Sequence, residues 1–547
     1  MKKENSELEV SSRLYVAIFF VFMVLIALPA ILVGLLYSKL LRKRQLSSFV
    51  HLGVIGVCLG LFCLLDIDYM VYLNGVKGIL KSFSLSGFNY WSAFLVGLFF
   101  GPVLGAALEI WYKYQPDWVK GKQQSCDINF NGKRYDKVLN KIKNYKHPED
   151  GILLGINTET QEVILNDEEL NSGCLILGAT GSGKTTTINN IIESCCQRNL
   201  PCFFIDGKGS RKQAQRVKEL ANKFGRKFYY FTITGTSHNY NPLSIGNSTE
   251  LKDKLISISD WTEPHYKAIC ERYLQVAFQI FNECGQKVDV INVTKWLTHD
   301  ALNVLLSNLP EEKQRRYGQV LDEIREEDIL GLINRIAIFS ESEAGEKLTE
   351  SGNAVINLYN AVKEKAIVVM SLDSLMYPEF SRALGRMIVN DLKTVASRLL
   401  DDSRKLYVIL DEFGVFAGNQ VTDLINKSRE AGFHNILSTQ ELADLKINGS
   451  DVLMKQIFGN TNVKIIHRQD VPDSAEFIAA SAGTIDSYAT TFQVDGSRET
   501  GAGTVKKDQS FIVHPNTIKW LSTGKAILIR KTPDFLVENI AVRWVDI

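Results

Sequence analysis

The sequence has almost no net charge, because its 62 Lys and Arg residues are balanced by 61 Asp and Glu residues. A protein that holds nucleic acid through its overall charge carries a large basic excess, so only local charge clusters bear on that function here. The nine cysteines contain no C-x-x-C pair, the spacing common in zinc sites. We therefore expect reduced thiols that pack as small hydrophobic side chains.

Hydrophobic runs long enough to cross a membrane occur only near the N-terminus. Residues 14–37 form an uncharged run, residues 49–65 a shorter one, and residues 90–112 a third that carries Glu109. A helix of about 20 apolar residues spans a bilayer, whereas a cleavable signal has a shorter apolar core and a small-residue cleavage site. We expect a transmembrane region over residues 1–115, with three spans favoured over two.

The charges between these runs predict their orientation. Four basic residues lie within residues 39–44, between the first two runs, and many more follow the third run. The positive-inside rule then places the large C-terminal part in the cytoplasm. The third run also has small residues at every fourth position from Ala93 to Gly105, a spacing that lets helices pack closely and fits an oligomer.

Residues 116–150 form a basic connector between the membrane region and the rest of the chain. Nine basic and three acidic residues lie between Lys113 and Lys146. A basic segment next to a membrane is expected to lie on anionic lipid, and the alternative is contact with the phosphates of a nucleic acid.

From residue 151 the pattern is that of an α/β fold, in which short apolar strands alternate with helices around a parallel sheet. The predicted strands cover residues 162–165, 173–177, 201–206, 227–233, 366–371, 405–410, 435–439, 463–466, 525–530 and 539–545. Residues 250–365 are polar, poor in glycine and apolar at helical spacing, which predicts an all-α insert. The α/β domain is thereby divided into a first part, 151–249, and a second part, 366–547.

A glycine-rich loop follows the predicted strand at 173–177. Residues 178–185 read GATGSGKT and match G-x-x-x-x-G-K-[ST], a loop whose backbone N–H groups cradle phosphates at a helix N-terminus. Lys184 is expected to reach the β- and γ-phosphates, and the Thr185 hydroxyl to ligate Mg²⁺. The residues expected to bind ATP are Gly178, Ala179, Thr180, Gly181, Ser182, Gly183, Lys184, Thr185 and Thr186. Because no LSGGQ-like stretch is present, the motor of an ABC transporter is excluded.

A second motif supplies acids at the end of another apolar strand. Leu406–Glu412 reads LYVILDE, which places two carboxyl groups at the edge where parallel sheets bind ligands. Asp411 is expected to hold Mg²⁺, and Glu412 to orient or deprotonate the attacking water. Gln440, after the strand at 435–439, is expected to sense the γ-phosphate.

Hydrolysis at an oligomer interface needs a cation that offsets the charge of the transition state. Arg429, Arg468 and Arg386, with Arg382, are the candidates for such an arginine finger. The sequence does not choose among them, and a solvated or ion-paired arginine is the ordinary alternative for each.

Taken in order, these motifs resemble the HerA–FtsK branch of RecA-like ATPases, and within it the TraD/TraG-type coupling proteins of type IV secretion and conjugation. The resemblance includes FIDGKGS, in which Asp206, Lys208 and Gly209 match a D-x-K-G motif. Its other stretches are GATGSGKT, Asn241–Leu243, Ala366–Leu392, Ile409–Gly418, Ser428–Phe433, Ser438–Gln440 and Gly459–Thr461.

The resemblance implies a RecA-like P-loop ATPase with an all-α insert, anchored by N-terminal transmembrane helices in the cell inner membrane. It implies ATP and Mg²⁺ as cofactors and a homohexamer that pumps DNA, single-stranded and without sequence preference, to a type IV secretion channel. The expected partners are a relaxase or relaxosome, or effector proteins, and the channel components. Family members commonly have two spans, and some carry a C-terminal tail that docks adaptors. Here the sequence ends just after the last predicted strands. We therefore expect adaptors or substrates to be recruited by another surface, such as the insert.

Three other functions are compatible with parts of the sequence. A coupling ATPase for protein effectors shares every motor motif. An FtsK-like translocase of double-stranded DNA usually ends in a winged-helix domain and lacks a long helical insert. A membrane scaffold with a vestigial nucleotide fold would not need Lys184, Asp411, Glu412 and Gln440 together.

Overall fold

The computed structural model describes residues 102–107 and 133–545, apart from 352–353, 401, 403, 447–448 and 496–497, and gives only the backbone of residues 133–136 and 489–504. The predicted spans 14–37 and 49–65 and most of 90–112 therefore lie outside the described residues. Among the described residues, no helix combines the length and apolar character needed to cross a bilayer. Contacts divide the chain into residues 1–123 and residues 124–547, and the labelled elements α6 to β15 belong to the second unit.

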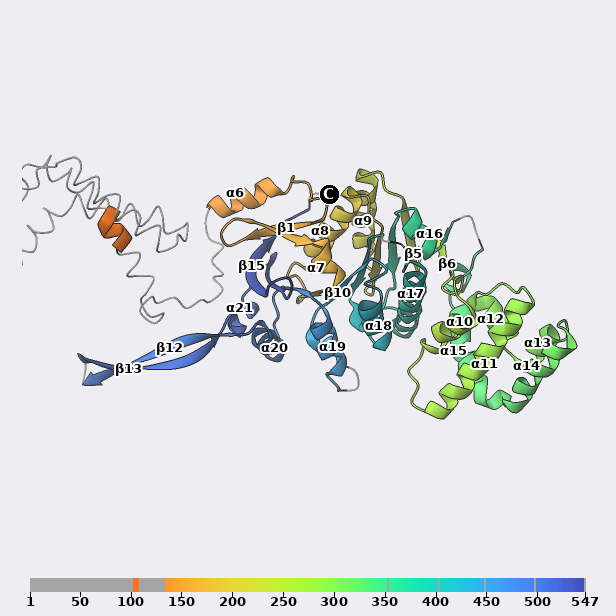
Figure 1. Ribbon diagram of the computed structural model, residues 1–547. Coiled ribbons are helices and arrows are strands. Elements are labelled where there is room, and N and C mark those ends of the chain that lie inside the picture. Colours follow the sequence, from red (N-terminus) through yellow and green to blue (C-terminus); the bar gives the residue numbers. More distant parts are fainter. Residues whose placement is uncertain are drawn as a thin grey trace, which may run out of the picture. The chain divides into compact units, whose positions relative to one another are not determined.

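A mixed sheet of 11 strands forms the centre of this unit (Figure 1). Its strands are β1 (Gly151–Asn157), β2 (Glu162–Asn166), β3 (Cys174–Leu177), β4 (Cys202–Asp206), β5 (Phe228–Thr232), β8 (Ile367–Ser371), β9 (Leu406–Asp411), β10 (Phe433–Thr439), β11 (Val463–Ile466), β14 (Lys525–Arg530) and β15 (Leu536–Val542). The spatial order is β2-β1-β15-β14-β11-β3-β10-β9-β4-β8-β5. The strands from β11 to β5 run parallel, and the other four are antiparallel additions at one edge. The predicted α/β fold with a sheet rich in parallel strands is confirmed.

Helices pack on both faces of the sheet and form the remaining layers of the fold. The longer helices are α6 (Lys133–Ile142), α8 (Lys184–Gln197), α9 (Arg211–Lys223), α10 (Ser248–Ile256), α11 (Pro264–Glu283), α13 (His299–Leu306), α14 (Glu311–Glu323), α15 (Glu326–Ser340), α17 (Pro378–Arg398), α18 (Asn419–Lys427), α19 (Val452–Asn460) and α20 (Pro472–Ala482). The shorter ones are α7 (Asp167–Asn171), α12 (Val290–Trp296), α16 (Leu358–Lys363), α21 (Pro515–Lys519) and the 3₁₀ turns η1 (Gly345–Leu348), η2 (Phe413–Phe416) and η3 (Leu442–Leu445).

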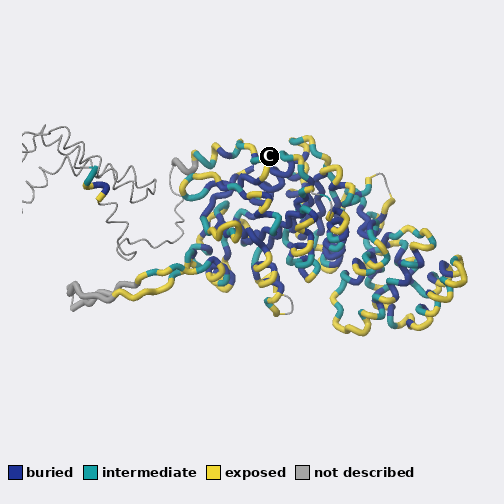
Figure 2. The backbone as a smooth tube through the Cα atoms, in the orientation of Figure 1, coloured by how far each residue is buried: buried dark blue, intermediate teal, exposed yellow. Residues whose placement is uncertain are grey.

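Alternate residues of each central strand enter different hydrophobic cores, as the period of a β-strand requires. On β3, Cys174 and Ile176 join the core under α8 and α9, whereas Leu175 and Leu177 join the core under α17 and α18. Both sets are fully buried, which explains why the strand reads as one continuous apolar run. Figure 2 shows this buried centre, with exposed residues concentrated at the periphery.

The helices α10 to α15 form a group that continues from the core under α17 (Figure 1). A buried ion pair joins the two parts, because Lys254 Nζ of α10 lies 2.7 Å from Asp391 Oδ1 of α17. The hydroxyl of Tyr240 donates to the other oxygen of Asp391 at 2.8 Å. Tyr240 belongs to a two-stranded ladder of β6 (Asn239–Tyr240) with β7 (Val355–Ile356), so the end of the predicted helical insert contains a strand.

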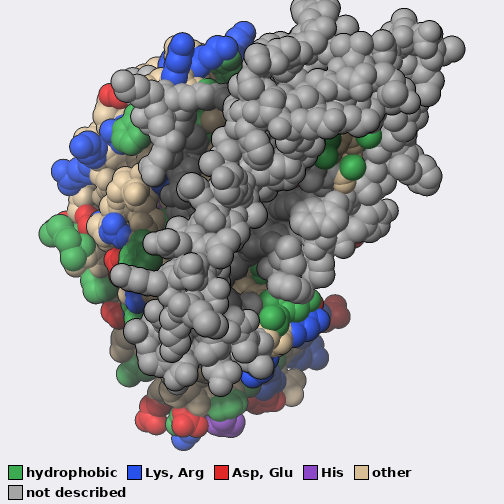
Figure 3. All heavy atoms as spheres, turned by 90° about the vertical axis from the view of Figure 1, so that its left-hand side faces the viewer, with side chains coloured by type: hydrophobic (Ala, Val, Ile, Leu, Met, Phe, Trp, Pro, Cys, Tyr) green, Lys and Arg blue, Asp and Glu red, His purple; other side chains and the backbone are tan. Residues whose placement is uncertain are grey.

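Part of the predicted basic connector is a structured element of the second unit. Helix α6 contacts β1, and Ile142 is buried together with Leu153, Ile156 and Ala541. The opposite side of α6 carries Lys137 and Lys141, both exposed. Lys and Arg side chains gather at the upper left of the view in Figure 3. The helix is therefore amphipathic and packs on the sheet through its apolar side. The count of charged residues in the connector did not predict this packing.

Two features at the C-terminal side differ from the predicted strands. β15 begins at Leu536 and ends at Val542, earlier than the predicted strand at 539–545. In addition, β12 (Thr484–Asp495) and β13 (Arg498–Phe511) form an antiparallel hairpin that projects from the body (Figure 1). Its alternating, largely polar sequence is typical of an exposed ladder rather than a buried strand, and the apolar-run criterion therefore missed it.

Candidate nucleotide-binding and catalytic site

The glycine-rich loop connects β3 to α8, and its shape depends on its glycines. Gly181 and Gly183 have φ angles of +77° and +118°, a region that other residues rarely adopt. A Cβ on Gly178 would lie 2.5 Å from Ser182 Oγ, and one on Gly183 would lie 2.8 Å from the backbone nitrogen of Gly524. The loop is therefore closely packed, with the N-terminus of a 14-residue helix directly behind it.

A segment far along the chain supports this loop from one side. The Gly524 N–H donates to the carbonyl of Ser182 at 2.9 Å, and the Thr523 hydroxyl donates to the carbonyl of Gly181 at 3.0 Å. On the other side, the Ala179 N–H donates to the carbonyl of Arg468 at 2.9 Å. These bonds hold the loop open in one conformation, so that its free N–H groups remain available to an anion.

A buried histidine fixes the start of α8 behind the loop. His467 Nδ1 lies 3.0 Å from the carbonyl of Lys525, so this nitrogen carries the proton, and Nε2 accepts from the Thr187 hydroxyl at 2.9 Å. Burial lowers the pKa of His467 to about 4, which keeps the ring neutral. The side chain therefore acts as a fixed bridge between β11, β14 and α8.

Two carboxylates meet where β4 and β9 end side by side. Asp206 and Asp411 are register partners in the parallel pair. Asp206 accepts hydrogen bonds from the N–H groups of Lys208 and Ser210 at 2.9 and 2.6 Å, although burial still raises its pKa. Burial raises the pKa of Asp411 to about 6, against the opposing charge of Lys184. Negative charge is thus concentrated at the carboxyl edge of the sheet, where a cation would be favoured.

A chain of polar contacts connects the loop to the acidic strand. Lys184 Nζ lies 3.0 Å from Glu412 Oε1, and the Gln440 amide donates to the same oxygen at 3.0 Å. The Thr180 hydroxyl in turn donates to Gln440 Oε1 at 2.9 Å. Glu412 has φ +49°, a left-handed conformation that is costly for a glutamate and is found mainly at functional turns. The strand end is thereby shaped to direct this side chain toward the loop.

A cavity of about 390 Å³ contains most of the predicted site residues. The members predicted from sequence are Ala179, Thr180, Gly181, Gly183, Lys184, Thr185, Thr186, Asp411, Glu412 and Gln440. Gly178 and Ser182 are buried and do not line the cavity, and Ser182 Oγ has no hydrogen-bond partner among the described residues. Backbone donors, a lysine and hydroxyls on one side, with carboxylates on the other, can hold a phosphate chain and a divalent cation.

The candidate arginines do not lie together at this cavity. Arg386 is buried and pairs with Asp260 at 2.9 Å, which connects α17 to the segment between α10 and α11. Arg382 pairs with Glu379 on the same helix, and Arg468 pairs with Asp470 at 3.1 Å. Arg429 is exposed in the turn that follows α18. Because Arg386 is already paired with Asp260, it is a poor candidate for an arginine finger. No sequence pattern could have indicated this ion pair.

Several residues of the cavity were not among the predicted site residues. They are Lys208, Ser210, Lys212, Gln213 and Arg216 around the start of α9, Asp206, and Thr523 and Trp544 from the C-terminal region. Asp206 and Lys208 had a signal, since they belong to the D-x-K-G motif. No sequence motif marks Thr523 and Trp544 as site residues, because only the packing of β14 and β15 beside β11 brings them to the loop.

Two family models match the segments that form this site. Residues 151–393, which include the loop and Asp206, match the central domain of the helicase HerA. Residues 405–522, which include Asp411, Glu412 and Gln440, match the model described as the TraM recognition site of TraD and TraG. Together the matches cover both sides of the cavity.

Two individual proteins are also similar to parts of this chain. The type 4 coupling protein DotL of Legionella pneumophila is 21% identical over 414 residues, 62% of this chain and 52% of DotL. An uncharacterized protein of Mycoplasma pneumoniae is 33% identical over 89 residues, 16% of this chain and 59% of that protein. The alignments thus span little more than half the length of either relative.

Among solved structures, the bacterial conjugative coupling protein TrwBdeltaN70 in its unbound monoclinic form has the same fold, with a TM-score of 0.50 at 14% identity. The match covers 74% of this chain and 91% of that one. Together, the HerA and TraD/TraG models on the two sides of the cavity and the similarity to DotL support a coupling protein of a type IV secretion system.

Proposed function

We propose that this protein is a coupling ATPase of the inner membrane that uses ATP to move DNA, as a single strand with or without a bound relaxase, to a type IV secretion channel. The observation that carries the proposal is the contact chain from Thr180 through Gln440 and Glu412 to Lys184, because it joins the phosphate loop to a carboxylate poised for hydrolysis. A protein that only bound a nucleotide would not need this connection.

The phosphate chain would lie on the backbone N–H groups of Thr180, Gly181 and Gly183–Thr185, with Lys184 moving from Glu412 to the β- and γ-phosphates. Mg²⁺ would be held by the Thr185 hydroxyl and Asp411. These are oxygen donors, which suit Mg²⁺, and the described residues contain no group of three or more His, Cys, Asp or Glu side chains that could hold a metal alone. Phosphate oxygens and water would supply the remaining ligands. The ion would offset charge that develops on the phosphates.

Glu412 would then accept the proton of the attacking water, or orient that water for in-line attack. Gln440, which contacts both Glu412 and Thr180, would report the presence of the γ-phosphate to the loop. The product of this step is inorganic phosphate and ADP. An arginine from a neighbouring copy would complete the site in a homohexamer, and the exposed Arg429 is the candidate whose side chain could extend to another copy.

The cargo is proposed from the family rather than from the site. The match to a TraM recognition site in residues 405–522 supports a partner of the relaxosome type. The multi-pass membrane anchor, the secretion channel as partner and the absence of sequence preference for DNA belong to the same proposal. The alternative cargo, protein effectors, uses the same motor and is separated from DNA only by experiment.

ATP hydrolysis by the purified full-length protein, with and without circular single-stranded DNA, tests the proposal. We expect Mg²⁺-dependent phosphate release that single-stranded DNA increases, and that Glu412→Gln abolishes. Hydrolysis that DNA leaves unchanged, but that a cognate effector stimulates, would favour the protein-effector alternative. Unchanged transfer by a Glu412→Gln strain would instead support the scaffold hypothesis.

A further inference from the structure

The chain leaves β15 at Val542 and runs through Arg543 and Trp544 beside the phosphate loop. The Val542 N–H donates to the carbonyl of Gly524 at 2.8 Å, and the Arg543 N–H donates to the carbonyl of Leu154 at 2.8 Å. Gly524 is the residue whose N–H supports the loop at Ser182. The segment that follows β15 is therefore fixed between β1 and the support of the phosphate loop.

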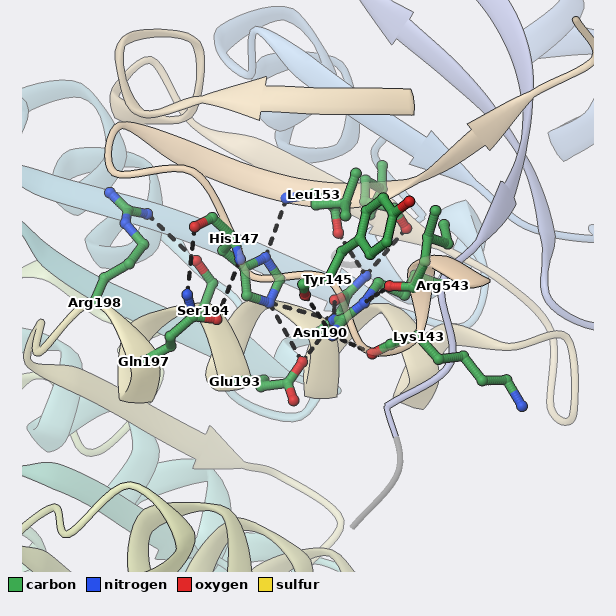
Figure 4. Close-up of polar contacts among 12 residues, drawn as sticks. Lys143, Tyr145, His147, Leu153, Asn190, Glu193, Ser194, Gln197, Arg198 and Arg543 are labelled. Carbon is green, nitrogen blue, oxygen red and sulfur yellow. Dashed lines mark hydrogen bonds and ion pairs between the residues drawn. The ribbon is translucent and has the colours of Figure 1, made fainter. Parts of the chain in front are cut away.

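Arg543 fixes this segment further through all five of its N–H donors (Figure 4). Nη1 donates to Glu193 Oε2 at 2.6 Å and to Asn190 Oδ1 at 2.8 Å, both on α8. Nε and Nη2 donate to the three carbonyls at and just after the C-terminus of α6, those of Ile142, Lys143 and Tyr145, at 2.8–3.2 Å. Arg543 is 2% exposed, and its bonds to Ile142, Asn190 and Glu193 are buried. One side chain thus joins α8, which begins at the phosphate loop, to α6.

Trp544 follows this buried anchor and behaves differently. It is 49% exposed, although Arg543 before it and Val545 after it are buried. It lines the same cavity as Lys184, Thr185 and Thr186. A large aromatic surface is therefore open to the cavity while its backbone is held on both sides. Packing alone does not explain this, because a tryptophan gains most from full burial.

The order of strands places Trp544 opposite the acids. β9 and β4, which carry Asp411 and Asp206, lie on one side of β3, whereas β15 lies on the other side beyond β11 and β14. The phosphate loop follows β3 and therefore lies between them. A nucleotide whose γ-phosphate faces Glu412 must extend its ribose and base in the opposite direction, toward the segment after β15.

We propose that Trp544 is the stacking platform for the base of the bound nucleotide, and that Arg543 is the positioning residue that holds it there. This inference rests on the proposed nucleotide binding at Lys184. Stacking on an indole uses the π-face that every base has and does not read its edges. Purine nucleotides with different edges, ATP and GTP, are therefore expected to bind with similar affinity through Trp544.

The affinity of the full-length protein for MgATP and for magnesium-bound inorganic triphosphate, which has no base, tests the platform. Trp544→Ala is expected to weaken ATP binding about tenfold, the value of one base–aromatic stack, and to leave triphosphate binding unchanged. Trp544→Phe should retain most of the ATP affinity. Trp520→Ala is the matched control, because Trp520 is 74% exposed and does not line the cavity.

Equal losses for ATP and triphosphate would overturn the platform, since they would show that Trp544 acts through the shape of the loop. Unchanged ATP affinity in Trp544→Ala would also overturn it, as would an equal effect of Trp520→Ala. Wild-type protein that binds neither ligand, or a Lys184→Ala variant that binds both normally, would overturn the proposed nucleotide site itself. The two failures are therefore distinguishable.

Discussion

Lys184 Nζ and Glu412 Oε1 lie 3.0 Å apart, although 228 residues separate them along the chain. When a nucleotide binds, we expect this contact to break. Lys184 would then contact phosphate oxygens, and Glu412 would contact the attacking water. The pair thus connects binding to hydrolysis at a single contact.

Replacement of Glu412 by glutamine should separate these two steps. The amide keeps the size of the side chain but lacks the basic oxygen, so we expect the hydrolysis rate to fall about 10²- to 10⁴-fold. ATP affinity should remain or increase, because Lys184 is released from its ion pair. Phosphate release and equilibrium binding measure the two effects. The exposed Glu430 provides the control substitution Glu430→Gln, and equal rates in the wild type and Glu412→Gln would contradict the assigned role.

The buried pair of Lys254 and Asp391 should be essential to the junction between α10 and α17. Both side chains are 1% exposed, so Lys254→Met would leave a buried carboxylate with only the Tyr240 hydroxyl, at a cost of about 3–5 kcal/mol. Thermal unfolding and proteolysis within α10–α15 would report the loss. The double variant Lys254→Met/Asp391→Leu should recover part of it, since no uncompensated charge remains.

The exposed pair of Lys267 and Glu271 is the control for this prediction. Its side chains are 44% and 36% exposed, and Lys267→Met should change the stability by less than about 1 kcal/mol. Equal effects of the two lysine substitutions would show that burial of the Lys254 pair has no special consequence.

Stability should fall in mild acid because of a histidine buried in the neutral form. His434 stacks on Tyr407, its Nδ1 lies 2.9 Å from the carbonyl of Gly432, and burial lowers its pKa to about 4. The unfolded chain takes up the proton near pH 6.5, whereas the folded chain resists it. Stability is therefore lost as the pH falls from about 6.5 toward 4, by on the order of 3 kcal/mol.

His434→Phe keeps a ring for the stack and removes the titration. The melting temperature of this variant should depend less on pH between 6.5 and 4 than that of the wild type. His265→Phe, at an exposed position, tests whether the loss of any histidine has the same consequence. Parallel pH profiles for wild type and His434→Phe would show that another group dominates.

Arg543→Lys should loosen α6 while leaving the sheet intact. A lysine keeps the positive charge beside Glu193, but its single nitrogen cannot serve the carbonyls of Ile142, Lys143 and Tyr145 as a guanidinium does. Buried carbonyls without donors cost about 1–3 kcal/mol each. Backbone hydrogen exchange should therefore increase in α6 and remain slow in α17. Arg404→Lys, at a half-exposed ion pair, is the comparison in which α6 should not respond.

The sequence by itself determined the parts of this protein that depend on neighbouring residues. Gly181 and Gly183 are required by the positive φ angles of the loop, and the apolar runs before Asp206 and Asp411 are required by strands buried on both faces. The apolar strand at 435–439 likewise predicted that Gln440, which follows it, lies at the same edge of the sheet. Each of these features depends on residues that are close together in the sequence, and the sequence alone therefore predicts them.

Only the tertiary structure decided which distant residues meet at that cavity. Register between β4 and β9 brings Asp206 beside Asp411, and antiparallel strands at the sheet edge bring Thr523 and Trp544 to the loop. Burial and pairing also decided that Arg386 is bound to Asp260 and that α6 is attached to the sheet through Arg543. Such contacts join residues more than a hundred positions apart in the sequence. They depend on how the sheet and its helices pack together, and no local sequence pattern predicts that packing.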